Sequence, residues 1–84
     1  MKSKRLLQKA ISNPENIRFT EVISLAEAFG FKLSRVKGSR HIFIHHQIRE
    51  LLNFQNVSGM AKSYQVKQLQ KIVEKYNLRL GETE

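Results

Sequence analysis

The stretch that decides the fold is FKLSRVKGSRHIFIH, residues 31–45. Its first part, residues 31–34, alternates apolar and polar side chains as a half-buried strand does. The turn Lys37-Gly38-Ser39 separates it from a second alternating run, residues 40–45. The pattern predicts a β-hairpin with a basic turn.

The second run of this hairpin carries apolar residues on both of its faces. Successive side chains of a strand point to opposite sides, so Ile42 and Ile44 share one face. His41, Phe43 and His45 share the other. We expect the isoleucines to face the core and Phe43 to lie on the open face, where it can stack an unpaired base. The alternative, with Phe43 in the core, stays open because a slip of one residue exchanges the faces.

An amphipathic helix is predicted before the hairpin. It begins near Phe19, with Thr20 as the N-cap, and it ends at Gly30. Apolar residues recur within it at positions 22, 25, 26 and 29, which lie on one side of a helix. This side is expected to face the core.

A third strand and a second helix are predicted after the hairpin. Residues 51–55 alternate, with Leu52 and Phe54 on one face. Residues 56–62 are predicted to be a loop, and Ser63 is the expected N-cap of a helix that ends near residue 77. The expected buried stripe of this helix is Val66, Leu69, Val73 and Tyr76. Lys67, Lys71 and Lys75 recur every fourth residue and form a cationic ridge on another side of the helix.

The sequence therefore predicts an α+β fold, α-β-β-β-α, with a three-stranded antiparallel sheet packed on two helices. This order resembles the double-stranded RNA-binding domain. We expect one domain at residues 18–80, preceded by a basic flexible N-terminal arm at residues 1–17 and followed by a tail at residues 81–84.

The charge of the chain points to a polyanionic partner. Fifteen Lys and Arg residues against seven Asp and Glu residues give its 84 residues a formal charge of +8. RNA is the expected partner of such a small basic domain. The chain has no cysteine and no apolar run of the about 20 residues that a membrane span needs. We therefore expect a cytoplasmic protein without disulfides and without a membrane partner.

His41 is the one residue well placed for acid and base chemistry. An imidazole exchanges protons near neutral pH, and Lys37 and Arg40 flank it in the sequence. Cations beside a reacting phosphate stabilise the charge that develops on its oxygens. Ser39 and the backbone amides around Gly38 add hydrogen-bond donors. RNA suits this group because its own 2′-OH is an internal nucleophile.

No metal, cofactor or small-molecule ligand is predicted. His41, His45 and His46 suggest a metal site, but His41 and His45 are about 13 Å apart along an extended strand. The ligands of one zinc ion each lie about 2 Å from it. The chain also shows no glycine-rich phosphate loop, no catalytic carboxylate pair and no Ser-His-Asp pattern.

Several of these motifs, taken in order, resemble the HicA-type toxins of bacterial toxin and antitoxin pairs. The resemblance covers about residues 19–80. It rests on four segments: Ala28-Phe29-Gly30-Phe31, then Lys37-Gly38-Ser39 followed by His41 and Ile42-Phe43, then residues 50–65, and finally Tyr76-Asn77-Leu78.

The resemblance implies a metal-independent ribonuclease of that fold, which cleaves mRNA and is neutralised by a HicB-like antitoxin. The catalytic histidine of the family corresponds to His41. Many members have a histidine directly after the Gly-Ser or Gly-Gly pair, where this chain has Arg40.

Two further functions fit the same residues. The first is a non-catalytic RNA-binding module that uses the hairpin and the lysine ridge. The second places these surfaces on an acidic partner protein. RNA cleavage, RNA binding without cleavage, and protein binding alone distinguish the three hypotheses.

Overall fold

Residues 2–80 are described by the computed structural model. They form three α-helices, one short 3-10 helix and four strands, in the order α1 (Lys2–Ser12), η1 (Pro14–Asn16), α2 (Phe19–Ala28), β1 (Lys32–Lys37), β2 (Arg40–His45), β3 (Ile48–Val57), β4 (Met60–Ala61) and α3 (Ser63–Lys75). None of these helices is long and apolar enough to cross a membrane. The tail expected at residues 81–84 lies outside the described residues.

The predicted α+β fold is confirmed. Helix α2, three strands and helix α3 follow one another as expected, and the strands form one antiparallel sheet in the order β1-β2-β3-β4. Strand β4 was not predicted; it pairs Met60 with Val57 and Ala61 with Asn56. A strand of two residues is too short to show a periodic pattern in the sequence.

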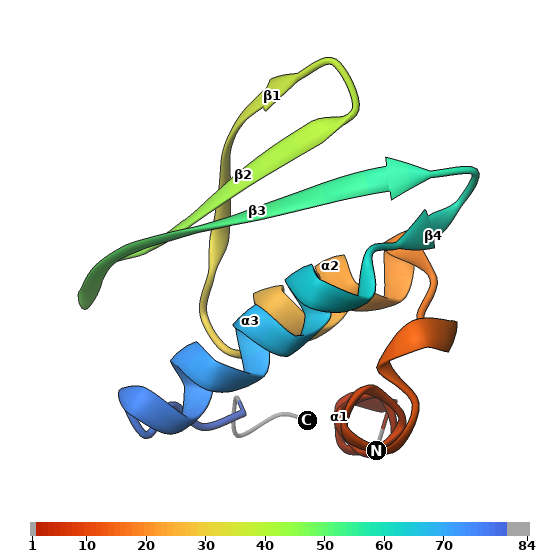
Figure 1. Cartoon of the computed structure of the whole chain (residues 1–84). Coiled ribbons are helices and arrows are strands. Elements are labelled where there is room, and N and C mark those ends of the chain that lie inside the picture. The colour runs from red at the N-terminus through yellow and green to blue at the C-terminus, as the bar shows by residue number, and fades with distance from the viewer. Residues whose placement is uncertain (1, 81–84) are drawn as a thin grey trace.

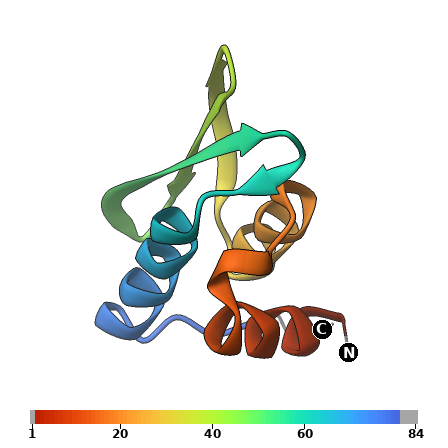
Figure 2. The same ribbon diagram turned by 45° about the vertical axis from the view of Figure 1, so that its right-hand side comes forward.

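The elements are stacked in layers. The sheet crosses over α2 and α3, and α1 lies on the other side of these two helices (Figure 1). The β1–β2 hairpin extends past the helical layer (Figure 2). We call the side of the sheet that is directed at the helices the inner face and the opposite side the outer face. The overhang leaves part of the inner face of the hairpin uncovered.

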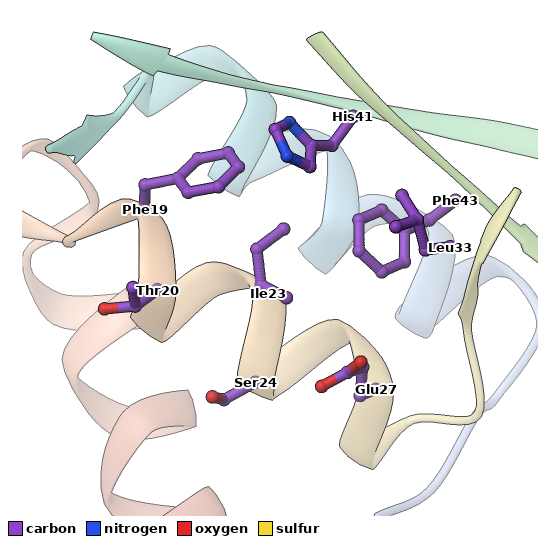
Figure 3. A pocket seen from close by; sticks show the side chains of 8 residues that line it. All are labelled: Phe19, Thr20, Ile23, Ser24, Glu27, Leu33, His41 and Phe43. Atoms are coloured by element: carbon purple, nitrogen blue, oxygen red, sulfur yellow. The ribbon is translucent and has the colours of Figure 1, made fainter. Parts of the chain in front are cut away.

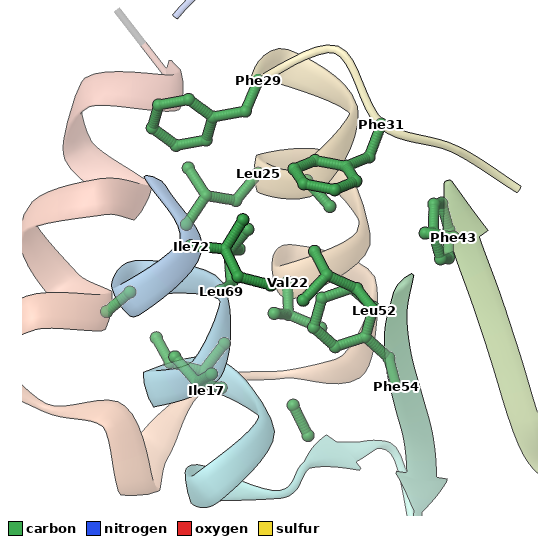
Figure 4. Packing of buried hydrophobic residues seen from close by; sticks show 14 of the residues in the cluster. Ile17, Val22, Leu25, Phe29, Phe31, Phe43, Leu52, Phe54, Leu69 and Ile72 are labelled. Atoms are coloured by element: carbon green, nitrogen blue, oxygen red, sulfur yellow. The ribbon is translucent and has the colours of Figure 1, made fainter. Parts of the chain in front are cut away.

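The core lies between the inner face of the sheet and the two helices (Figure 4). The predicted stripe of α2 is confirmed, because its residues at positions 22, 25, 26 and 29 are all buried. Leu52 and Phe54 of β3 are buried as predicted. Phe31, just before β1, completes the aromatic part of this core.

The expected facing of β2 is wrong. Phe43 is only 1% exposed, whereas Ile44 is 42% exposed. The register pairs Phe43 with Leu52 and His41 with Phe54, so these four residues share the inner face. The rings of Phe43 and Phe54 meet edge to face, with centroids 5.7 Å apart. The open alternative, with Phe43 in the core, is therefore confirmed. In this arrangement the larger aromatic side chain takes the buried position and the isoleucine takes the exposed one.

His45 shares the buried face of β2 because both of its ring nitrogens find partners. Nε2 lies 3.2 Å from the carbonyl oxygen of Phe29, and Nδ1 accepts the Gln47 N–H at 3.1 Å. A neutral ring with its proton on Nε2 makes both bonds. Gly30 allows this close packing: its φ is +98°, and a Cβ there would lie 2.9 Å from His45 Nε2.

The expected flexible N-terminal arm is wrong. Residues 2–12 form α1, and Ala10 and Ile17 belong to the buried core. Leu6 and Leu7 pack against this core from the same helix. Ala10 follows them at the i+4 and i+3 spacings of one helix side. The high density of lysine and arginine around these residues hid the amphipathic pattern.

The expected stripe of α3 is partly wrong. Val66 and Leu69 are buried as predicted, but Tyr76 is 37% exposed and lies just past the end of the helix. Gln65 and Ile72 are buried with the stripe. The Gln65 side chain accepts the Gln55 N–H at 2.7 Å, and this bond makes its burial possible. Lys62, and not Ser63, occupies the N-cap position.

Glu21 joins α1 to the first turn of α2. Its carboxylate accepts the backbone N–H of Arg18 at 2.9 Å and the ammonium group of Lys9 at 3.1 Å. Arg18 is thus the N-cap residue, in place of Thr20. The backbone N–H of Arg18, assisted by Lys9, holds the pKa of Glu21 below its ordinary value of 4.5, against the opposing effect of desolvation.

We predict that Glu21→Gln lowers the free energy of unfolding by about 1 kcal/mol at neutral pH. The pKa of Glu21 is lower in the folded than in the unfolded chain, so its stabilisation is full above the unfolded value and is lost as pH falls through the folded value. Urea denaturation near pH 7 and near pH 3 measures this difference. The exposed Glu74, replaced in the same way, is the control. An equal loss at both pH values would contradict this role of the carboxylate.

A second prediction concerns Gly30. Gly30→Ala lowers the free energy of unfolding by about 3 kcal/mol for two reasons. The new Cβ clashes with the His45 ring, and alanine is strained at the positive φ of this position. Gly38→Ala is the matched control: its φ is also positive, but no atom lies within 4 Å of the added Cβ. We expect about 1 kcal/mol there. Equal losses in thermal unfolding would show that the His45 contact has no energetic weight.

Candidate functional site

His41 stands on the inner face of β2 beside the first residue of α2. Its ring and that of Phe19 are arranged edge to face, with centroids 4.8 Å apart. His41 is half-buried. Its Nδ1 atom is buried and has no hydrogen-bond partner within the described part of the chain. No protein group of residues 2–80 therefore satisfies this polar atom, which is uncommon for a buried nitrogen.

A groove of about 380 Å³ opens beside His41, between α2 and the hairpin. Its walls are mostly apolar: Phe19 and Ile23 point from α2 toward β2, and Leu33 faces them from β1 (Figure 3). Its remaining lining residues are Thr20, Ser24, Glu27, His41 and Phe43. The groove exists because the hairpin extends beyond the helices. His41 is thus placed on the wall of an open, largely apolar groove.

Lys37 and Arg40 are not on the same side of the sheet as His41. They are paired across the end of the hairpin. Arg40 directly precedes His41 in β2, so its side chain points to the outer face. The structure thus separates the two cations from the imidazole that they flank in the sequence.

The turn between β1 and β2 is exposed at Gly38 and Ser39. The Ser39 carbonyl accepts the Asn56 N–H at 3.1 Å, and its hydroxyl oxygen lies 3.4 Å from Gln55 Nε2. These bonds tie the turn to β3. The turn therefore has a defined position next to Lys37 and Arg40.

Phe43 does not present its ring to a ligand. Its ring is only 1% exposed and belongs to the core, although Phe43 is also one of the residues that line the groove. The interpretation of Phe43 as a stacking platform on the open face is therefore wrong. The aromatic ring that does stand beside the imidazole is that of Phe19.

The lysine ridge of α3 is divided. Lys67 and Lys71 are exposed and line a shallow depression together with Tyr64 and Gln68. Lys75 forms an ion pair with Glu50, 3.0 Å away. The hydrogen bond from Tyr76 has the larger effect on the pKa of Glu50, and together with the one from Lys75 it holds this pKa below its ordinary value. Two of the three lysines thus remain available on the helix surface.

The sequence did not lead us to predict the groove residues of α2 and β1. Phe19 and Ile23 are four residues apart, a spacing that places them on one side of the helix beside the buried stripe. This second apolar stripe was a usable signal. Leu33 gave no signal, since its role depends on the overhang of the hairpin.

No group of three or more His, Cys, Asp or Glu side chains that could hold a metal ion occurs within residues 2–80. His45 is committed to its two hydrogen bonds, and His46 stacks on it with ring centroids 4.9 Å apart. These two histidines therefore have structural surroundings that differ from those of His41.

The sequence pattern of a family described as HicA toxin of bacterial toxin-antitoxin matches residues 19–75. The chain belongs to the HicA toxin family. The match runs from the first residue of α2 to the last residue of α3 and includes every residue that lines the groove. No curated protein and no solved structure gives a significant match. Helix α1 of this HicA toxin lies outside the matched region.

The unsatisfied nitrogen of His41 leads to a prediction about the stability of this HicA toxin. We expect His41→Leu to keep or raise the free energy of unfolding, by up to about 1 kcal/mol, because a buried polar atom without a partner is removed. His45→Leu should lower it by about 2 kcal/mol, because two hydrogen bonds are lost. Chemical denaturation of both variants tests the contrast. A similar loss of unfolding free energy in both variants would contradict this expectation, because the His41 side chain would then stabilise the fold as much as the His45 side chain does.

Proposed function

We propose that this HicA toxin is a metal-independent endoribonuclease that cleaves mRNA in the cytoplasm, with His41 as its general acid or base. The observation that carries the proposal is the position of His41. It is a half-buried imidazole on the wall of an open, largely apolar groove, beside the ring of Phe19. A titratable side chain on the wall of a groove is a candidate for acid and base chemistry. The HicA family, known for mRNA interferase toxins, supports this assignment.

The proposed reaction uses the 2′-OH of the RNA as the nucleophile. Nε2 of His41 is the nitrogen that we assign to proton transfer, since Nδ1 is buried. Nε2 takes the 2′-OH proton, and the 2′-oxygen bonds to the adjacent phosphorus. The bond from phosphorus to the 5′-oxygen breaks, and the leaving oxygen receives a proton from the imidazolium or from water. Such proton transfer contributes about 10² to 10⁴ in rate.

Phe19 supports this role by fixing the orientation of the imidazole. The edge-to-face contact with Phe19 restricts rotation of the imidazole ring, and the apolar Phe19 ring limits the access of water to it. A catalytic group held in one orientation loses less entropy when the substrate binds. We therefore assign Phe19 as a positioning residue.

The cations of the chain bind phosphates on either side of the one that reacts. Lys37, Gly38, Ser39 and Arg40 form an exposed basic turn at the hairpin end, where backbone and side-chain donors suit a neighbouring phosphate. Lys67 and Lys71 offer a second contact on α3. Each phosphate neutralised in this way releases counterions, so binding weakens as salt rises.

A HicB-like antitoxin is the proposed protein partner, since the family is defined by toxin and antitoxin pairs. An antitoxin that covers the groove would keep RNA from His41. The second candidate function is a non-catalytic RNA-binding module. The separation of Lys37 and Arg40 from His41 favours it, because these cations then bind RNA without assisting a reaction.

Cleavage of single-stranded RNA in the presence of EDTA tests the proposal. We expect His41→Ala to lower the rate by about 10² to 10⁴ while RNA binding, followed by fluorescence anisotropy, persists. His46→Ala is the matched control, since it removes an exposed histidine of the β2–β3 turn. It should leave the rate within about twofold.

The other outcomes separate the hypotheses. Cleavage that survives His41→Ala contradicts the role of this imidazole. Cleavage that EDTA abolishes indicates a metal-dependent reaction. Salt-sensitive binding without any scission supports the non-catalytic module.

A further inference from the structure

Strand β1 forms an open edge of the sheet. It pairs with β2 on one side, and it is the terminal strand of the order β1-β2-β3-β4. All six of its residues, Lys32–Lys37, are exposed. The strand lies in the part of the hairpin that extends beyond the helical layer (Figure 2). Its free backbone donors and acceptors are therefore accessible to another chain.

The two sides of β1 differ in chemistry. Leu33 and Val36 lie on the inner face, opposite Phe43 and His41, and they are 48% and 49% exposed. The three cations of the strand lie on the outer face: Lys32, Arg35 and Lys37 pair with Ile44, Ile42 and Arg40. One side of the edge is aliphatic and the other is basic.

A bulge at Ser34 maintains this separation. The register shifts between Leu33 and Arg35, so Ser34 is an extra residue in β1. Without the bulge, strict alternation would put Arg35 on the same side as Leu33. The extra residue moves Arg35 to the outer face and Val36 to the inner face.

The basic side of the edge continues across the sheet. Arg40 of β2 and Arg49 of β3 extend it on the outer face. No carboxylate shares this face among residues 2–80, because Glu50 turns to Tyr76 and Lys75 on the helix side. Glu27 lies on the other side, at the groove. An acidic side chain is thus attracted to the outer face and repelled from the inner one.

We propose that β1 receives an extended segment of a partner protein, which adds a fifth strand to the sheet. The segment places carboxylates on the outer face against Lys32, Arg35 and Lys37. It places aliphatic side chains on the inner face against Leu33 and Val36. Backbone hydrogen bonds supply affinity, and the alternation of acidic and aliphatic residues supplies specificity.

A protein strand fits this edge better than RNA does. The exposed apolar residues of the hairpin are aliphatic, whereas unpaired bases stack on aromatic side chains. The exposed aromatic residues within the described part of the chain, Tyr64 and Tyr76, belong to the region of α3. Basic residues on an edge strand can serve only to prevent aggregation. That role would not explain the two half-exposed aliphatic residues, Leu33 and Val36, on the other side of the same strand.

The added strand would also narrow the entrance to the groove. Leu33 lines the groove, so the aliphatic side chains of the added strand that cover Leu33 lie next to the groove.

The proposal does not depend on RNA cleavage, and it holds for a catalytic or a non-catalytic protein. Its test therefore uses binding alone.

The test uses an eight-residue fluorescent peptide that alternates Asp and Val, with binding followed by anisotropy at low salt. We expect the peptide to bind at least about tenfold more tightly than a Lys-Val peptide of the same pattern. It should also bind more tightly than a peptide of the same composition with all Asp residues in one block. N-methylation of alternate backbone amides should abolish binding for one set of positions and spare the other.

Charge reversal locates the site on the protein. The double variant Lys32→Glu and Arg35→Glu should weaken the Asp-Val peptide by at least about tenfold and favour the Lys-Val peptide. Lys67→Glu and Lys71→Glu make the same change in net charge on α3, and they should alter binding by about twofold or less. All four side chains are exposed, so the fold is retained.

Three results would overturn the proposal. The first is equal binding of the Asp-Val and Lys-Val peptides. The second is tolerance of N-methylation at every position, which would exclude strand addition. The third is a loss of binding to an RNA oligonucleotide in the Lys32 and Arg35 variant without any change in peptide binding, which would assign this edge to nucleic acid.

Discussion

Burial of Phe43 against Phe54 and Leu52 determines the direction of every side chain in β2. Once Phe43 faces inward, alternation directs His41 toward Phe19 and the groove, and it directs Arg40 to the outer face. Loss of a buried phenylalanine costs about 3 to 5 kcal/mol, a large part of the stability of a small domain. The packing of one aromatic side chain thus fixes both the site of His41 and the basic outer face.

The order of helices and strands was predictable because each pattern is local. The apolar stripe of α2, the turn at Gly38 and the alternation around Leu52 are visible in short segments. The facing of β2 was not predictable, since RHIFIH has apolar residues on both sides and the choice is made by β3. The groove depends on Leu33 and Ile23, which lie ten residues apart and meet only because the hairpin overhangs α2. His41 was predicted from its local sequence, but its apolar neighbours were not.

Arg40 acquires a clearer meaning from this geometry. It directly follows the Gly38-Ser39 pair, where the family resemblance implies a histidine in many members. In this chain, position 40 lies on the outer face, so a histidine there would point away from the groove and from His41. Arg40 therefore belongs with Lys37, Arg35 and Arg49 in a basic surface rather than with the imidazole. The two faces of the hairpin thus carry different proposed roles: RNA chemistry on the inner face and recognition of charge on the outer face.

The chemical ends of the RNA fragments test the central claim most directly. If His41 activates the 2′-OH of the substrate, wild-type protein in EDTA leaves a 2′,3′-cyclic phosphate on the upstream fragment and a 5′-hydroxyl on the downstream fragment. Mass spectrometry of a short RNA after one round of cleavage distinguishes these ends. Fragments with a 3′-hydroxyl and a 5′-phosphate would contradict the account, because water and not the 2′-OH would then be the nucleophile.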